Sequence, residues 1–363
     1  MCSSDLGWTA ATRIGALGAQ PWGDILKPAV ATAAESIRML DGFRVELLRS
    51  SQPGEGSWVS MTLDPKGRLI VSPQGEEPML RITLDAAGQV ANIETIDLPV
   101  RGAMGLLYAF DSLYVNGRGK EGYHLYRLRD TNGDDKYDSV ELLRRWKGGD
   151  GEHGAHGIVL GPDQKIYTIC GNFVDVPGDL ASNSPHRNYA DDLVLPRMED
   201  GNGFGAGRKP PGGFVARMNP DGSACELLAS GQRNTYDIGF NTQGELFGFD
   251  SDMEWDWGMP WYRPIRAYQL VSGGDQGFRE GSAKWPEYYA DSLPATVNIG
   301  IGSPTGVRFG TGAKFPARYQ QAFYMMDWSY GRISVVHLKE AGAGYEASAE
   351  TLLRGKPLNV TDL

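Results

Sequence analysis

Residues 58–75 read WVSMTLDPKGRLIVSPQG and hold two apolar runs separated by DPKG. Apolar runs joined by a turn of this composition predict an antiparallel β-hairpin. Two more strand-like runs follow, PMLRITLD at 78–85 and NIETIDL at 92–98. Together they make a four-stranded antiparallel unit of about 40 residues, which is the spacing typical of a propeller blade.

The same pattern recurs along the chain, which predicts four further blades at 103–146, 155–231, 234–272 and 304–354. A sixth blade begins at PLNVTDL, residues 357–363, where the sequence ends, and FRVELL at 43–48 is the predicted closing strand. We therefore predict an all-β fold over residues 41–363, a six-bladed β-propeller of four-stranded antiparallel blades with its last blade truncated.

The region before residue 41 differs in character. Residues 1–6, MCSSDL, resemble the translated end of a sequencing adaptor, and we expect them to be foreign to the fold. Residues 7–40 are predicted to form a short helical lead-in, because apolar residues in KPAVATAAESIRML, 27–40, fall near helical spacing.

Composition narrows the function classes. The net charge of −10 and the lack of a basic stripe argue against a nucleic-acid partner. No apolar run reaches the roughly 18–20 residues of a membrane span. Cys2, Cys170 and Cys225 form no CxxC motif, so we expect buried free thiols, with a Cys170–Cys225 disulfide as the alternative.

Two loops that enter predicted inner strands carry polar side chains. EHGAHGIVL, residues 152–160, contains His153 and His156, and GQRNTYD in the next blade contains Arg233 and Asn234. A histidine there can act as a general base or can satisfy a backbone carbonyl. The Arg-Asn pair offers donors to a carboxylate or oxyanion, and the alternative is an ion pair between blades.

Carboxylates gather in DSDMEWDW, residues 250–257, at alternate positions: Asp250, Asp252, Glu254 and Asp256. Such a cluster can hold a hard cation such as Ca²⁺. The aromatic residues beside it suit either stacking on a sugar ring or packing between blades; they are Trp255, Trp257, Trp261 and Tyr262.

A second calcium motif is DTNGDDKYDSVE, residues 130–141, although its glycine stands at loop position 4 rather than 6. The predicted ligands are five side chains and one backbone carbonyl, that of Lys136; the side chains are Asp130, Asn132, Asp134, Asp138 and Glu141. The alternative interpretation is an Asn-Gly hairpin with solvated acids.

GPDQKIY at 161–167, preceded by a Glu-His pair, resembles the active-site blade of the soluble quinoprotein glucose and sorbosone dehydrogenases. The resemblance implies His153 as the base that takes a sugar hydroxyl proton, with His156 as its neighbour at the cofactor. It further implies that Arg233 and Asn234 contact the quinone PQQ and that Asp250 and Asp252 lie near the calcium ion of the cofactor.

This chain departs from that family in the fifth blade. Where those dehydrogenases place a quinone-binding lysine, MDWSYGRIS has Ser329 or Tyr330, and Arg332 is the nearest cation. We therefore include Arg332 among the expected cofactor-binding residues.

Over residues 40–363 the chain is similar to the membrane-bound dehydrogenases predicted in planctomycetes and verrucomicrobia, which pair such a propeller with helical-repeat and cytochrome c-type haem domains. EHGAHGIVLGPD, RNTYDIGFN and SPTGVRFGTGAKFPARYQ carry this likeness. It implies oxidation of a sugar or polyol hydroxyl with hydride transfer to PQQ. It also implies electron transfer to a haem domain beyond this sequence, in the periplasm or outside the cell.

Two other functions stay open at this point. One is a non-catalytic, calcium-stabilised propeller that binds glycans or partner domains. The other is a calcium-dependent propeller hydrolase, similar to a lactonase, with Asp250, Asp252 and Asn234 around the ion.

Overall fold

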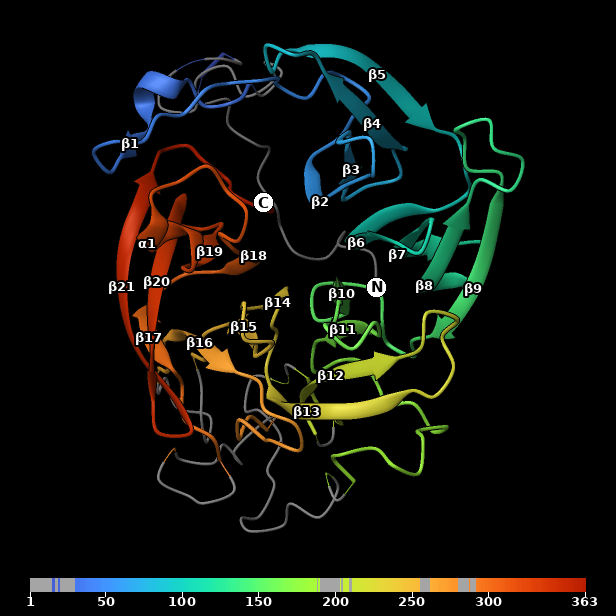
Figure 1. Cartoon of the computed structure of the whole chain (residues 1–363), viewed down its shortest axis with the longest axis vertical. Helices are drawn as coiled ribbons and strands as arrows, with labels where there is room; N and C mark the ends of the chain where they lie inside the picture. Colours follow the sequence, from blue (N-terminus) through green and yellow to red (C-terminus); the bar gives the residue numbers. More distant parts are fainter. Residues whose placement is uncertain are drawn as a thin grey trace, which may run out of the picture.

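The computed structural model describes residues 15–16, 19, 30–187, 189, 203, 205–208, 211–254, 262–279, 287 and 292–363. Within these ranges the chain is all-β and forms five antiparallel sheets, each built around four strands that are consecutive in the sequence. The sheets stand around a common centre (Figure 1).

The first two sheets have their strands in sequence order. The first contains β2 Trp58–Leu63, β3 Leu69–Pro73, β4 Met79–Leu84 and β5 Val90–Ile96. The second contains β6 Arg101–Ala109, β7 Ser112–Gly119, β8 Gly122–Arg129 and β9 Ser139–Arg145.

The remaining sheets repeat this order, with longer connections. The third contains β10 Ala155–Leu160, β11 Ile166–Cys170, β12 Gly213–Met218 and β13 Glu226–Gln232. The fourth contains β14 Ile238–Phe240, β15 Leu246–Asp250, β16 Ile265–Gln269 and β17 Val297–Gly300. The fifth contains β18 Pro304–Phe309, β19 Phe323–Asp327, β20 Arg332–Ala341 and β21 Gly344–Arg354, with α1, Ala317–Gln320, between β18 and β19.

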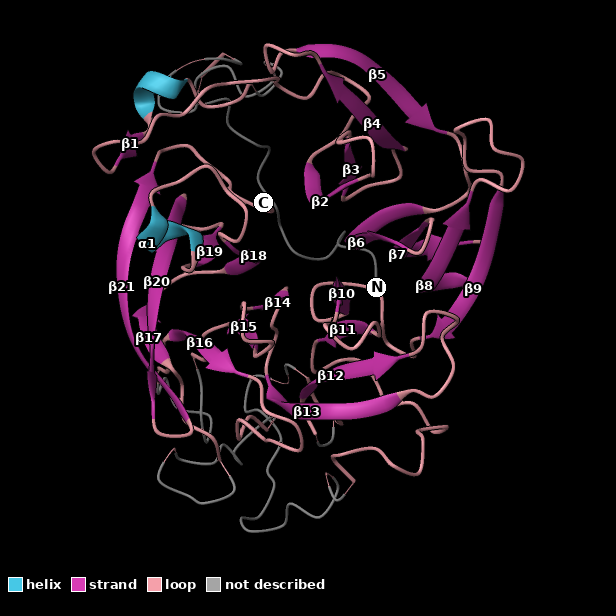
Figure 2. Ribbon diagram, viewed as in Figure 1, coloured by secondary structure: helices cyan, strands magenta, loops and turns pink. Residues whose placement is uncertain are grey.

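The first strand of each sheet lies innermost, and the last lies at the outside of the ring (Figure 2). The C-terminal segment, residues 358–363, runs beside the innermost strands β18 and β2. The Gly306 N–H donates to the Thr361 carbonyl at 2.7 Å, and the Met61 N–H donates to the Asp362 carboxylate at 2.6 Å. This segment therefore joins the fifth sheet to the first.

The cores lie between neighbouring sheets, where apolar side chains of the pleated faces interlock. Tyr114 of the second sheet packs in one cluster with Phe214 of the third. Phe247 of the fourth sheet and Phe309 of the fifth have ring centroids 5.6 Å apart. Burial of these faces keeps the inner strands in fixed register around the axis.

Several sequence predictions need correction. FRVELL, residues 43–48, is not a strand; instead β1, Arg38–Met39, pairs with β21 at the edge of the fifth sheet. Within 30–40 the predicted helix is reduced to one 3-10 turn, Ala34–Ser36. The fourth strand of the fourth sheet, β17, was missed because residues 270–296 separate it from β16.

Other expectations agree with the structure. Cys170 and Cys225 are both buried free thiols. In the part of the chain that the structure describes, no helix is long and apolar enough to cross a membrane.

Candidate functional site

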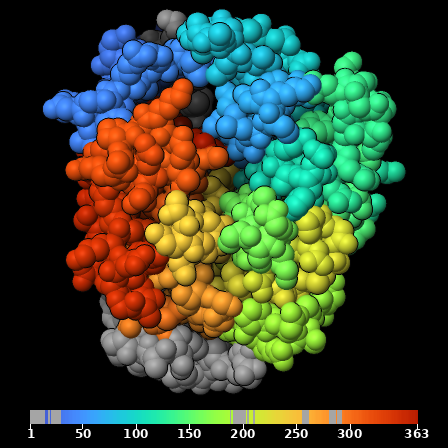
Figure 3. All heavy atoms as spheres, viewed as in Figure 1, coloured from blue at the N-terminus to red at the C-terminus, as the bar shows by residue number. Residues whose placement is uncertain are grey.

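A cavity of about 560 Å³ lies where loops from all five sheets meet the C-terminal segment. Each of the five innermost strands contributes a lining residue, either from the strand itself or from just before its start. The C-terminal segment contributes one more. These residues are Val59, Met104, His156, Tyr236, Thr305 and Thr361. Figure 3 shows the molecule hollowed at the centre of the ring. The repeat thus brings side chains far apart in sequence to one axial mouth, which we call the axial cavity.

His156 is the histidine on the wall of this cavity. Its ring stacks on Tyr236 with centroids 4.9 Å apart, and its Nδ1 has no hydrogen-bond partner within the described part of the chain. Burial lowers the pKa of His156 to about 4, so the imidazole is neutral at neutral pH.

His153 lies behind the wall and does not line the cavity. It is 1% exposed, its Nδ1 is hydrogen-bonded to Asn172 Oδ1, and its ring packs on Phe173 at 4.7 Å. Burial, followed by the nearby charge of Arg233, lowers its pKa to about 4. The structure therefore brings both predicted histidines to this loop but exposes only His156 to the cavity.

Arg233 and Asn234 also line the axial cavity. The Asn234 Nδ2 donates to the Glu152 carbonyl at 3.0 Å, which ties this loop to the histidine loop. The Arg233 guanidinium lies 3.2 Å from Ser251 Oγ and 3.6 Å from Glu254. Its side chain is 16% exposed, which makes it the inner cation of the site.

Asp250, predicted as a calcium ligand, holds this loop instead. Its carboxylate accepts the backbone N–H groups of Arg233 and Asn234, both at 2.9 Å, and the Thr235 hydroxyl at 3.1 Å. Asp250 is 1% exposed and does not line the cavity. Because it accepts these three donors, Asp250 positions the Arg-Asn pair; its predicted role as a calcium ligand stays a prediction.

Asp252 does line the cavity, together with Glu254. The Tyr262 hydroxyl donates to Asp252 at 2.9 Å, and burial raises the pKa of Asp252. The other predicted members of this region, Asp256 and the tryptophans at 255, 257 and 261, lie outside the described residues.

The rim of the cavity carries charges that the sequence reading missed. Arg118 pairs with Asp150 and lies 3.7 Å from Glu76, and all three line the cavity. These rim side chains are half to three-quarters exposed, at 50% for Arg118 and 78% for Glu76. Trp328 also lines the cavity. An alignment of the sequence repeats against one another would have indicated Tyr236 and Met104 as cavity residues, but no sequence pattern identifies Arg118 or Trp328.

Arg332, predicted to bind the cofactor, does not line the axial cavity. Its Nε donates to Asp327 at 2.7 Å, and its Nη2 donates to the Ile301 carbonyl at 2.6 Å. This side chain belongs to the fifth sheet and its neighbouring loop, so Arg332 does not supply the cation expected in the cavity.

The predicted calcium loop forms a chain of tight turns. Asp130 accepts the N–H groups of Gly133 and Asp135 at 2.7 and 2.8 Å. Asn132 and Asp134 each accept the N–H two residues ahead, and Asp138 accepts the Thr131 hydroxyl.

Glu141 points away from this loop. It lies on β9, and its carboxylate accepts Arg127 Nη2 at 2.6 Å. Among the described residues, no group of three or more His, Cys, Asp or Glu side chains is arranged to hold a metal ion. Calcium binding at this loop therefore stays a prediction.

Asp135, which the sequence reading passed over, connects this loop to the first sheet. Its carboxylate accepts Arg68 at 2.6 and 2.7 Å and pairs with Lys66 at 2.8 Å. The Arg68 guanidinium holds the pKa of Asp135 well below its usual range. The loop thus connects the second sheet to the first through the ion pairs of Asp135.

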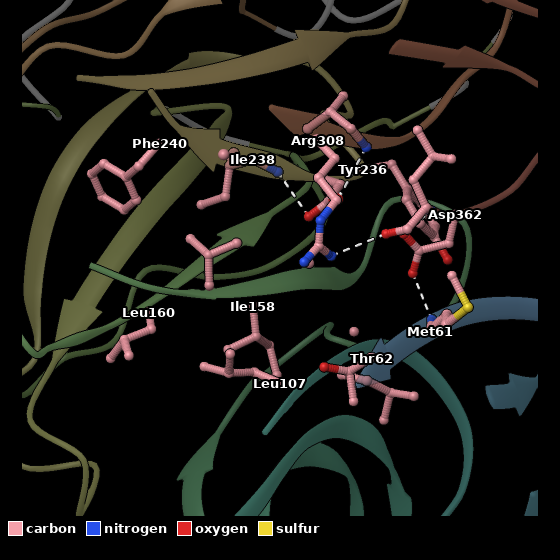
Figure 4. A pocket seen from close by; sticks show the side chains of 18 of the residues that line it. Met61, Thr62, Leu107, Ile158, Leu160, Tyr236, Ile238, Phe240, Arg308 and Asp362 are labelled. Carbon is pink, nitrogen blue, oxygen red and sulfur yellow. Dashed lines mark hydrogen bonds between the residues drawn. The ribbon is translucent and has the colours of Figure 1, made fainter. Parts of the chain in front are cut away.

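A second cavity, of about 390 Å³, continues along the inner strands beyond the axial cavity (Figure 4). Tyr236 and Met104 line both spaces and separate them. In the second cavity Asp237 accepts the Val307 N–H at 3.0 Å, and Asp362 accepts the Met61 N–H. Each of these carboxylates joins one inner segment to the next.

Comparisons with known proteins show the fold. No protein-family model matches the chain, and no curated protein matches it. The PQQ-bound aldose sugar dehydrogenase from Streptomyces coelicolor aligns over 90% of this chain and 88% of its own, with a TM-score of 0.59 and 17% identity. A putative glucose dehydrogenase from Thermus thermophilus aligns over 90% of this chain and 89% of its own, with a TM-score of 0.60 and 16% identity.

The PQQ domain of a pyranose dehydrogenase from Coprinopsis cinerea aligns over 88% of this chain and 86% of its own, with a TM-score of 0.57 and 13% identity. The chain therefore has the fold of soluble quinoprotein sugar dehydrogenases, with its five sheets arranged as in a β-propeller. At these identities the likeness establishes the fold alone.

Proposed function

We propose that this chain is the propeller of a quinoprotein-like dehydrogenase that oxidises a hydroxyl group of a sugar or polyol in the axial cavity. The observation that carries the proposal is the convergence of His156, Arg233 and Asn234 on one cavity. The fold shared with sugar dehydrogenases supports it. In this proposal the C-terminal segment begins a sixth blade, as the sequence predicted.

Two guanidinium groups of the cavity could pair with the carboxylates of a planar, anionic quinone such as PQQ. Arg233 is the inner cation and Arg118 the outer one, whereas the carboxylates Glu76 and Asp150 are rim groups, 78% and 55% exposed. Glu152, Asp252 and Glu254 also line the cavity, and Glu254 lies 3.6 Å from Arg233, so an anionic quinone would need a divalent cation to offset these carboxylates. In this proposal Asp252 and Glu254, which both line the cavity, would supply carboxylate oxygens to a Ca²⁺ bound with the cofactor.

When bound, PQQ would supply the hydride acceptor for oxidation of the hydroxyl carbon. In this proposal His156 accepts the hydroxyl proton, because its neutral imidazole lines the cavity whereas His153 does not. Tyr236 stacks on the ring and fixes its plane. His153, for which the sequence predicted the base role, supports the loop through Asn172.

Two histidine variants test this division of roles. We expect His156→Gln to lower kcat by a factor of about 100 or more with sugar binding retained, as for loss of a general base. His153→Gln should mainly lower the melting temperature. The opposite pattern, with turnover lost only in His153→Gln, would return the base role to His153.

The proposed function itself is tested by reconstitution. The full chain is incubated with PQQ and Ca²⁺, PQQ binding is measured by calorimetry, and dye reduction is followed with a panel of aldoses and polyols. Arg233→Gln should weaken PQQ binding, and Lys339→Gln, an exposed cation on β20, serves as the control. Absence of both PQQ binding and dye reduction would reject the proposal.

A second candidate is a propeller that binds glycans without catalysis. The supporting observation is that, among the described residues, five carboxylates and two guanidinium groups line the axial cavity, together with Trp328. Carboxylates accept hydrogen bonds from sugar hydroxyls, and a tryptophan face stacks on sugar rings. Sugar binding of equal affinity with and without PQQ, and no turnover, would favour this candidate.

A lactonase-like hydrolase has less support. It needs a cation held by several side chains, and Asp250 is already used by the Arg-Asn loop. Transfer of electrons to a haem domain and a periplasmic or secreted location remain part of the proposal, to be tested by reduction of an added cytochrome c and by cell fractionation.

A further inference from the structure

A second groove opens beside the axial cavity, between the turn after β19 and the segment after β21. It has a volume of about 740 Å³, and Trp328 lines both it and the axial cavity. Its charged lining residues are all cations: Arg38, Arg354 and Lys356. We call this space the arginine groove; it is distinctive because the chain as a whole carries a net charge of −10.

The cations are brought together by strand pairing. Arg354 of β21 is the direct partner of Arg38 on β1 and of Arg332 on β20. Directly paired residues of antiparallel strands project on the same face, and like charges placed so are destabilising. The row Arg38–Arg354–Arg332 therefore has an electrostatic cost that an anion would relieve.

Only one member of this row is neutralised. Arg332 pairs with Asp327 at 2.7 Å. In the described ranges, Arg38, Arg354 and Lys356 have no carboxylate within ion-pair distance, and no Asp or Glu lines the groove. All three side chains are exposed, so a ligand reaches them without any rearrangement of the sheet.

Two aromatic rings complete the wall. Trp328 is 48% exposed and Tyr330 is 43% exposed, although aromatic side chains are mostly buried. An exposed aromatic face beside hydrogen-bonding groups suits stacking on a sugar ring. The groove thus combines cations that can pair with an anionic group and aromatic faces that can stack on the sugar ring carrying that group.

We propose that the arginine groove binds an acidic saccharide, whose carboxylate or sulfate group pairs with Arg38, Arg354 and Lys356 while its ring packs on Trp328 or Tyr330. Because Trp328 borders both spaces, the sugar units of one oligosaccharide can extend from the groove into the axial cavity. The idea that this oligosaccharide is then oxidised rests on the proposed function; binding in the groove does not.

The neighbouring charges favour a short acidic saccharide over nucleic acid. Five carboxylates line the adjoining axial cavity, and they repel a long polyanion. Nucleic-acid binding also needs an extended basic surface, and the cations here are confined to one groove.

The test uses the full chain without cofactor. A negative result then rejects binding in the groove without bearing on the dehydrogenase proposal. Calorimetry compares three oligosaccharide sets of equal length, which are neutral, uronate-containing and sulfated, at low and moderate salt. We expect at least one acidic set to bind about tenfold or more tightly than the neutral set, with affinity falling as salt rises. The two acidic sets distinguish carboxylate from sulfate.

The variant with Arg38→Gln, Arg354→Gln and Lys356→Gln should lose this preference, by about tenfold or more. A matched control removes three exposed cations elsewhere, Arg44→Gln, Lys147→Gln and Lys339→Gln, and should bind as the parent does. Retention of binding in the groove variant would overturn the proposal, and so would equal affinity for neutral and acidic sets.

Polyglutamate of matched charge is the final arm. If it binds as tightly as the acidic saccharides, the sugar component of the proposal is wrong, and the groove fits an acidic protein surface. The groove variant without ligand should melt no lower than the parent, because it removes like-charge repulsion between paired strands. A lower melting temperature would contradict the electrostatic argument.

Discussion

Replacement of Asp250 by alanine is the sharpest test of how the Arg-Asn loop is held. The change removes the acceptor of three hydrogen bonds, from the Arg233 and Asn234 N–H groups and the Thr235 hydroxyl. It also removes a negative charge from beside Arg266, which is the direct strand partner of Asp250. The Arg266 side chain is buried, at 1% exposure.

The magnitude follows from these contacts. Hydrogen bonds to a charged group contribute about 1.5–3 kcal/mol each. Loss of the carboxylate also leaves the two N–H groups and the hydroxyl without a hydrogen-bond acceptor. Entry of water and relaxation of the loop reduce the sum. We expect Asp250→Ala to lower the free energy of unfolding by about 3–5 kcal/mol, with a smaller loss for Asp250→Asn, which keeps one acceptor oxygen.

The assay is urea unfolding followed by tryptophan fluorescence, with Asp252→Ala as the matched control. Asp252 accepts one hydrogen bond, from the exposed Tyr262, so its loss should cost about 1 kcal/mol or less. Each measurement is made with Ca²⁺ and again with a chelator. A positioning role gives the same loss in both conditions, whereas a calcium ligand gives its loss only with the ion present.

Two results would refute the reasoning. The first is an Asp250→Ala variant that is no less stable than Asp252→Ala. The second is a stability loss that disappears in the chelator, which would restore Asp250 as a metal ligand.

Three further predictions use the same measurement. In Gly105→Ala the new Cβ would lie 2.1 Å from the His156 carbonyl oxygen, so we expect a loss of about 1–3 kcal/mol and weaker ligand binding at the axial cavity; unchanged stability would contradict this packing. Asp135→Ala should cost about 1–2 kcal/mol, a value discounted because the Asp135 side chain is 40% exposed. The pKa of Asp135 is depressed by Arg68, so this stability is present above the unfolded carboxyl value of about 4 and is lost as pH falls below it; the variant should lack that acid dependence. Burial raises the pKa of Asp237, so the native chain binds more protons than the unfolded chain above about pH 4, and stability should decline as pH rises toward neutral. Asp237→Asn should flatten this decline, and an unchanged pH profile would show that Asp237 is not its source.

The strands that could be predicted are those joined by short turns. Residues 58–75 form a hairpin because the alternation of apolar residues and the DPKG turn act locally, and the structure has β2 and β3 there. The prediction failed where pairing depends on distant chain. FRVELL has a strand-like pattern, but the edge of β21 pairs with Arg38–Met39 instead.

The candidate site shows the same division. The sequence indicated the loops that carry His153, His156, Arg233 and Asn234, because these polar residues stand directly before predicted inner strands. It could not say which histidine reaches the axis, since the two are three residues apart and local sequence does not set which ring faces the centre. The stacking of His156 on Tyr236, from another sheet, decides this.

By itself, then, the sequence determined the all-β repeat and the loops that meet at its axis, because alternation and turn composition act over a few residues. Only the tertiary structure decided what each carboxylate and guanidinium does. Asp250 holds a loop because the N–H groups of Arg233 and Asn234 lie within 2.9 Å of its oxygens. The arginine groove exists because strand pairing places Arg38 opposite Arg354, although the two residues lie near opposite ends of the chain.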